Sequence, residues 1–177
     1  RVSLATIKKY KNAKTEVETA LKNADKAEEK AVKKADEAVG ADEAANVVGT
    51  EADAVKRVAG EVKTEVDKLG KKVEDELVKK GKSDIEGSKL ETVVNGAIEI
   101  MKNEEKRLDK KVTNLTEAVE NLEKKVAEED ARLKAEEDAR LKAEQAAREE
   151  EEAKRVEAEA AAEAKRLVDE QAAREEE

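Results

Sequence analysis

The chain contains no cysteine, histidine, proline, tryptophan or phenylalanine, and Tyr10 is its only aromatic residue. Without cysteine there is no disulfide framework. Without histidine, the three serines of the chain have no imidazole to activate them as nucleophiles. No apolar run approaches the roughly 20 residues that a membrane-spanning helix needs. These absences argue against nucleophilic catalysis and against a transmembrane segment, so we expect a protein that is not an enzyme.

The residues that are present favour helix. Of the 177 residues, 47% are charged, and glutamate (35) and alanine (31) are the most frequent types. Both have high helix propensity, and a chain of this composition is typical of long helices or coiled coils. Disorder is the alternative for so charged a sequence. The periodic placement of apolar residues described below decides against it.

The first expected helix covers residues 3–39. Ser3 is a good N-cap, and Gly40 suits the position after the helix end. Apolar residues recur about every 3.5 positions through this segment, which predicts one buried face. The predicted face consists of Leu4, Ile7, Tyr10, Ala13, Val17, Leu21, Ala24, Ala27, Ala31, Ala35 and Ala38. We expect Tyr10 to be a core residue rather than a ligand contact.

A second helix is expected over residues 50–80, after a connection at 40–49 that holds at most a short helical turn. Thr50, followed by Asp53, is the predicted cap of this helix, and Gly81 is its predicted end. Valine often occurs in strands, but the spacing of four, three, four, three, four and four here is helical. The predicted buried face consists of Val55, Ala59, Val62, Val66, Leu69, Val73 and Leu77.

A third helix is expected to follow the loop GKSDIEGS. Ser88 and Glu91 have the spacing of a capping box, which predicts a helix over residues 89–127. Its predicted face consists of Val94, Ile98, Met101, Leu108, Val112, Leu115, Val119, Leu122 and Val126. Three amphipathic segments of similar length with short connections predict an all-α, elongated, antiparallel three-helix bundle in an up-down-up order. We assign this bundle to residues 1–127.

Residues 128–177 form a second predicted domain, an acidic helical stalk that continues the third helix. The octapeptide EEDARLKA is written twice here, and EQAAREEE occurs at 144–151 and 170–177. This segment carries 10 basic and 19 acidic residues, whereas residues 1–127 carry 27 of each sign. Its few large apolar residues drift around the helix, so they provide no continuous seam for a partner helix.

Ion pairs along the stalk can replace a core. Acid-first pairs four residues apart stabilise an isolated helix, and alanine adds propensity. The predicted pairs are Glu128–Arg132, Asp130–Lys134, Glu136–Arg140, Asp138–Lys142, Glu144–Arg148, Glu150–Lys154 and Glu151–Arg155. The repeat therefore indicates a spacer that maintains its own helix.

Few residues suggest a chemical site. The carboxylates lie on helices without a predicted pocket, and no Asp/Asn-rich loop with a central glycine resembles a calcium-binding loop. No glycine-rich phosphate loop is present either. Taken together, these absences lead us to expect no catalytic residue, no cofactor and no metal. Lysines and arginines are interleaved with acidic residues, and aromatic side chains that could stack on nucleobases are missing. We therefore expect no nucleic-acid partner. Asn114, in the triplet Asn114-Leu115-Thr116, is a candidate N-glycosylation site.

The Glu/Ala-rich composition, the lack of cysteine and the segment EEDARLKAEEDARLKAEQAAREEEEAKRVEAEAAAEAKRL together resemble the glutamic acid/alanine-rich surface proteins of the African trypanosome Trypanosoma congolense. The resemblance implies a coat protein of stages in the insect vector. It also implies attachment to the membrane by a C-terminal glycosylphosphatidylinositol anchor, as an elongated helical bundle packed against neighbouring coat molecules. The family has no catalytic residues. Neither an anchor-addition tail nor a signal peptide is recognisable, so we expect such segments outside these 177 residues.

With a C-terminal anchor, the loop between the second and third helices would lie farthest from the membrane. The predicted membrane-distal tip consists of Lys82, Ser83, Asp84, Ile85, Glu86, Gly87 and Ser88. Two other functions stay open. The bundle could be a ligand-binding or adhesion module at the cell surface, or the chain could be an intracellular coiled-coil scaffold whose stalks pair.

Overall fold

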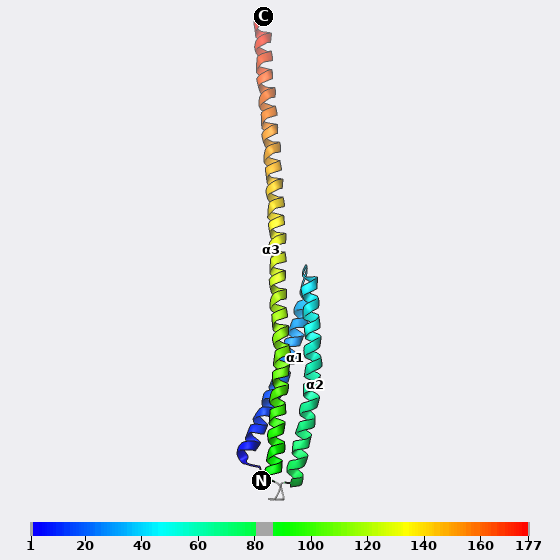
Figure 1. Ribbon diagram of the computed structural model, residues 1–177. Helices are drawn as coiled ribbons and strands as arrows, with labels where there is room; N and C mark the ends of the chain where they lie inside the picture. The colour runs from blue at the N-terminus through cyan, green and yellow to red at the C-terminus, as the bar shows by residue number, and fades with distance from the viewer. Residues whose placement is uncertain (1, 81–86, 177) are drawn as a thin grey trace. The chain divides into compact units, whose positions relative to one another are not determined.

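A computed structural model describes residues 2–80 and 87–176 of the chain. These residues form three helices, α1 (Leu4–Glu37), α2 (Asp42–Lys80) and α3 (Gly87–Glu175), and include no strand (Figure 1). The chain divides into two compact units, residues 1–127 and residues 128–177. In the first unit the three helices pack against one another. The prediction of an all-α, helical-bundle protein is confirmed at this level.

The core of residues 1–127 consists of small and medium aliphatic side chains. The predicted faces of the second and third helices are buried or half-buried along their length, and Tyr10 is buried on α1 as predicted. The largest fully buried side chains are Met101, Leu108, Leu115, Leu122, Val17, Val48, Val55, Val58, Val62, Val66, Val73 and Val94. Valine outnumbers leucine in this set, so hydrophobic burial per residue is modest and each large side chain matters.

One end of the predicted face on α1 was wrong. Leu4 is 85% exposed, whereas Thr6 is buried. Thr6 lies four residues before Tyr10 and therefore on the same face, whereas Leu4 is two residues before Thr6, about 200° around the helix. The Thr6 hydroxyl donates a hydrogen bond of 2.7 Å to Glu91 Oε1 on α3, which satisfies the buried polar group.

The predicted start of the second helix was also wrong. It begins at Asp42 rather than after a cap at Thr50, and Thr50 lies inside the helix with its hydroxyl bonded to the Asn46 carbonyl. The buried stripe continues upstream at helical spacing through Ala41, Ala44, Val48 and Ala52. Burial along this stripe outweighs the cost of about 1 kcal/mol for a glycine at position 49. Asp42 and Glu43 also favour a helix start, because carboxylates stabilise the N-terminal end of the dipole.

The first helix ends at Glu37, two residues before the predicted boundary, and Ala38 is its C-cap. Gly40 then has φ 80°, a left-handed conformation that costs other residues free energy. The sequence prediction that Gly40 marks this turn is confirmed, although it lies one position later than the C′ position. The third helix begins at Gly87 rather than Lys89.

Two glycines near this turn should respond oppositely to alanine. A Cβ added at Gly49 meets nothing within 4 Å, so Gly49→Ala is expected to raise the free energy of unfolding by about 0.5–1 kcal/mol. The matched change Gly40→Ala is expected to lower it by about 1 kcal/mol because of the positive φ. Urea denaturation followed by Tyr10 fluorescence measures both. A loss of stability for Gly49→Ala would contradict a continuous α2.

Polar contacts join the helices of residues 1–127 at several levels. Near the start of α1, Ser3 and Thr6 both donate to Glu91 of α3. Near its end, Lys34 is bonded to Glu123 of α3. Between α1 and α2, Lys14 Nζ lies 3.6 Å from Glu74 Oε1. Arg107 of α3 is bonded to Glu61 of α2. These pairs lie at the edges of the apolar core and join positions that are distant in the sequence.

The second unit, residues 128–177, has no core of its own among its described residues. Every residue from 130 to 176 is exposed. Its large apolar side chains are 46–67% exposed, namely Leu133, Leu141, Val156, Leu167 and Val168. Because no side chain is buried there, helix in this unit depends on propensity and on contacts along its own surface.

Candidate functional site

Most of the predicted tip, Lys82, Ser83, Asp84, Ile85 and Glu86, lies outside the described residues. Gly87 and Ser88 are the first two residues of α3. The assignment of a membrane-distal tip therefore stays a prediction.

The candidate glycosylation triplet lies within α3. Asn114 is half-buried and precedes Leu115, which is 1% exposed. The Thr116 hydroxyl donates a hydrogen bond of 3.0 Å to the Val112 carbonyl, inside the same helix. Sequons that carry glycans are expected in surface loops. Glycosylation at Asn114 stays a prediction, and its helical setting does not favour it.

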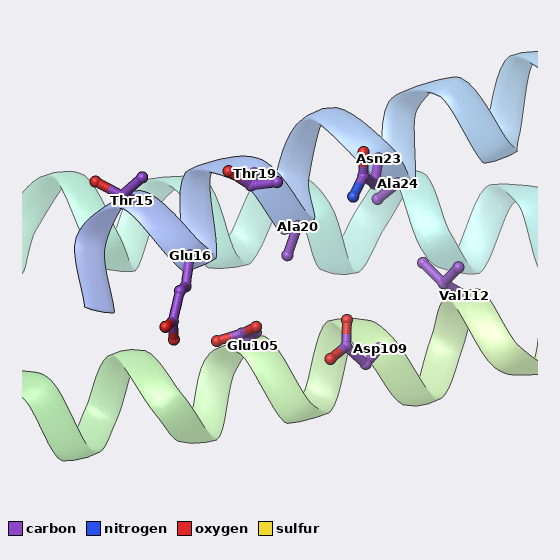
Figure 2. Close-up of a pocket in the computed structure, with 9 residues that line it drawn as sticks. All are labelled: Thr15, Glu16, Thr19, Ala20, Asn23, Ala24, Glu105, Asp109 and Val112. Carbon is purple, nitrogen blue, oxygen red and sulfur yellow. The ribbon is translucent and has the colours of Figure 1, made fainter. Parts of the chain in front are cut away.

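An open groove lies between α1 and α3 (Figure 2). It has a volume of about 310 Å³, and most of the α1 side chains that line it are small. The lining residues are Thr15, Glu16, Thr19, Ala20, Asn23 and Ala24 of α1 and Glu105, Asp109 and Val112 of α3. Figure 2 shows the Glu16 side chain extending from α1 toward Glu105, with Asp109 one turn further along α3. Three carboxylates thus share one groove, and no lysine or arginine lines it.

The electrostatics of the groove disfavour the charged form of Glu105. Its pKa is raised above the ordinary value for a glutamate, first by partial burial and then by the negative charges of Asp109 and Glu16. Glu104, the preceding residue, instead faces a cation, since Arg107 Nη1 lies 3.6 Å from Glu104 Oε2. The groove is therefore an acidic surface between two helices, in which Glu105 is half-buried and Glu16 and Asp109 are exposed.

Tyr10 is the second unusual polar group of this unit. Its hydroxyl is buried without a hydrogen-bond partner, and its pKa is raised, first by burial and then by the nearby charges of Glu74 and Glu18. A Cβ added at Gly70 of α2 would lie 3.6 Å from this hydroxyl. This is an ordinary van der Waals distance, so the tyrosine hydroxyl lies against α2 beside Gly70.

The ion pairs of residues 128–177 differ in part from those predicted. Arg132 contacts Glu129, three residues earlier, and Glu136, four residues later. Two more arginines repeat this arrangement, Arg155 with Glu152 and Glu159, and Arg166 with Glu163 and Glu170; Arg140 contacts Glu144. Among the predicted acid-first pairs, Glu144–Arg148 at 4.0 Å and Glu150–Lys154 at 3.4 Å are confirmed.

The preference for Glu at i−3 and i+4 has a geometric reason. Viewed down the helix axis, the i−3 and i+4 positions lie about 60° and 40° from the arginine in the same rotational direction. The i−4 position lies about 40° from it in the other direction. A guanidinium has donors on two edges and can hold both carboxylates in a single rotamer. In Arg132, Nε and Nη2 bind Glu129 while Nη1 binds Glu136. The contacts of Arg140 and Arg155 are therefore not with the predicted i−4 partners, Glu136 and Glu151.

Within residues 2–80 and 87–176, no group of three or more acidic, histidine or cysteine side chains is placed to hold a metal ion. No helix in this part of the chain is both long and apolar enough to cross a membrane.

Comparison of the chain with protein-family models, with curated proteins and with solved structures finds no match.

Proposed function

We propose that the chain is a non-enzymatic structural protein of a protective cell-surface coat. In this proposal, residues 1–127 form an elongated, up-down-up antiparallel bundle, and the charged remainder of α3 is a stalk between the bundle and its attachment. The two units then have different tasks. The bundle presents a mostly polar exterior, and the stalk sets its distance from the membrane.

Contacts between the helices support the up-down-up order. Thr6 with Glu91 and Lys34 with Glu123 join α1 and α3 in the same sequence direction. Lys14 with Glu74 joins an early residue of α1 to a late residue of α2, as expected when these helices run in opposite directions. Short connections between neighbouring helices also favour antiparallel packing.

The observation that carries the proposal is the self-pairing of residues 128–177. These residues are exposed almost throughout, and their arginines bind glutamates of the same helix. A helix that is stabilised along its own surface needs no partner and no core. Such a segment suits a spacer better than an enzyme element or an oligomerisation seam.

Surface location and a lipid anchor are proposed from the resemblance to the trypanosome glutamic acid/alanine-rich proteins. The test is antibody binding to residues 1–127 on live, unpermeabilised insect-stage cells, before and after treatment with a phospholipase that cleaves phosphatidylinositol anchors. We expect binding before treatment and its loss afterwards. Binding that requires permeabilisation would contradict surface location.

The shielding role has its own test. Deleting the gene is expected to increase the binding of antibodies to other surface proteins of the cell, and re-expression should restore shielding. A matched control re-expresses the anchored chain without residues 128–177, which should restore less shielding because the bundle lies closer to the membrane. Unchanged antibody access after deletion would contradict a coat.

A ligand-binding or adhesion module is the second candidate, and the groove between α1 and α3 favours it. A scaffold whose stalks pair is less favoured, because residues 128–177 present no continuous apolar seam. Sedimentation of the full chain separates these possibilities from a scaffold. A monomer at high micromolar concentration is expected, and a tight parallel dimer would support the scaffold instead.

A further inference from the structure

The groove between α1 and α3 is lined by three carboxylates and by no basic side chain that would neutralise them. Glu16 reaches into it from α1, and Glu105 and Asp109 enter it from α3 (Figure 2). No basic side chain and no residue of α2 belongs to its lining. The charged groups that act on Glu105 are Asp109 on its own helix and Glu16 on the facing helix. At neutral pH the two helices therefore meet here through like charges.

We propose that this groove is an acid-strengthened joint, in which protonation of Glu105, which shares the groove with Glu16 and Asp109, tightens the packing of α1 on α3. Neutralising one carboxyl removes the repulsion between the helices. It also creates an O–H donor, which can bond a neighbouring carboxylate across the groove. This property is separate from the coat function and does not depend on it.

The direction of the pH effect follows from linkage. The pKa of Glu105 is raised in the folded state, so the folded protein binds more protons than the unfolded chain near this pKa. Stability from this group is present below its ordinary pKa and is lost as the pH rises through the raised value. Acidification from neutral pH therefore stabilises the bundle through Glu105.

An ion pair in the same unit acts in the opposite direction. The pKa of Glu123 is lowered, first by its hydrogen bond with Lys34 and then by the charge of that lysine, so its contribution is lost on acidification. A pH series on the unchanged protein therefore mixes both effects. The effect of Glu105 on stability therefore has to be measured as the difference between the unfolding midpoints of the unchanged protein and a variant.

The experiment compares thermal unfolding of the full chain and of Glu105→Gln at pH 7.5 and pH 5.0, followed by tyrosine fluorescence. Tyr10 is the only aromatic residue, so the signal reports residues 1–127 alone. Glu105→Gln removes the charge and keeps the shape. We expect its midpoint to lie about 2 °C above that of the unchanged protein at pH 7.5, and this gain to be smaller at pH 5.0.

Glu99→Gln is the matched control, because Glu99 is exposed on the same helix and outside the groove. Because it removes no charge from the groove, it should not give the gain that Glu105→Gln gives at pH 7.5. Glu16→Gln should give a smaller gain at pH 7.5, because Glu16 acts on Glu105 less than burial and Asp109 do. Adding it to Glu105→Gln should contribute little more, because both changes relieve the same repulsion between Glu16 and Glu105. A Glu105→Gln variant that behaves like Glu99→Gln, or that is less stable at pH 7.5, would overturn the proposal.

A second measurement needs no variant. Carbon NMR of the side-chain carboxyls should show the Glu105 carboxyl titrating above the ordinary pKa of a glutamate in the unchanged full chain. An ordinary or lowered pKa of Glu105 would overturn the proposal even if the variants fold poorly.

Discussion

Leu108→Ala is expected to lower the free energy of unfolding of the helical bundle by about 3 kcal/mol. Leu108 is 0% exposed and lies on the core face of α3. Truncation removes buried apolar surface and leaves a cavity that the surrounding helices fill only in part. The core consists mostly of valines and alanines and contains few large residues. The neighbouring side chains are therefore too short to fill the cavity easily. Urea denaturation followed by Tyr10 fluorescence gives the loss directly.

Leu141→Ala is the matched control for this change. It is the same substitution on the same helix, but Leu141 lies in residues 128–177 and is 46% exposed. We expect a change within about 0.5 kcal/mol, because exposed substitutions have small effects and alanine is a strong helix former. Equal losses at positions 108 and 141 would mean that Leu141 is buried by a partner in solution, which would favour a paired scaffold.

Ala147→Pro is expected to break the helix within residues 128–177 at a local cost of about 3 kcal/mol. Proline removes one backbone hydrogen bond, and its ring clashes with the carbonyl of Ala143. No buried contact compensates, because every neighbouring side chain is exposed. Circular dichroism should show a loss equivalent to roughly ten helical residues around the break, since short helical pieces fray in water.

The same variant tests whether the two units are stable independently. The urea midpoint reported by Tyr10 should not change, because the substitution lies outside residues 1–127. Ala147→Leu, which keeps both the helix propensity and the backbone donor, should leave the circular dichroism signal unchanged. A parallel loss of the Tyr10 transition in Ala147→Pro would contradict two separate units.

Helical spacing was a reliable guide to burial wherever it extended over several turns. The faces through Val62 and Leu115 were predicted correctly, because a periodic apolar stripe has one stable arrangement in a bundle. Errors arose where local signals competed with that stripe. Gly49 and Thr50 resemble a helix boundary, but the buried residues Val48 and Ala52 on either side carry α2 through it.

The groove could not be predicted from the sequence. Glu16 and Glu105 are 89 positions apart, and nothing in either neighbourhood marks them as facing each other. Their meeting depends on the relative height and rotation of α1 and α3. Contacts such as Thr6 with Glu91 and Lys34 with Glu123 accompany that register. These polar partners are also distant in sequence, so only the packed structure reveals them.

The ion pairs of residues 128–177 show an intermediate case. Composition and spacing correctly indicated that acids and bases pair within the helix. Sequence alone did not decide among i−4, i−3 and i+4 partners, because an arginine such as Arg132 has acids at all three positions. The rotamer that serves two carboxylates at once decides this choice.

Circular dichroism of the isolated segment 128–177 is the most direct test of a stalk that maintains its own helix. At neutral pH and low ionic strength the segment is expected to be mostly helical. Its helicity should fall toward about 1 M salt, where screening weakens the Arg–Glu pairs. A segment that is mostly coil at low ionic strength would contradict a self-supporting spacer.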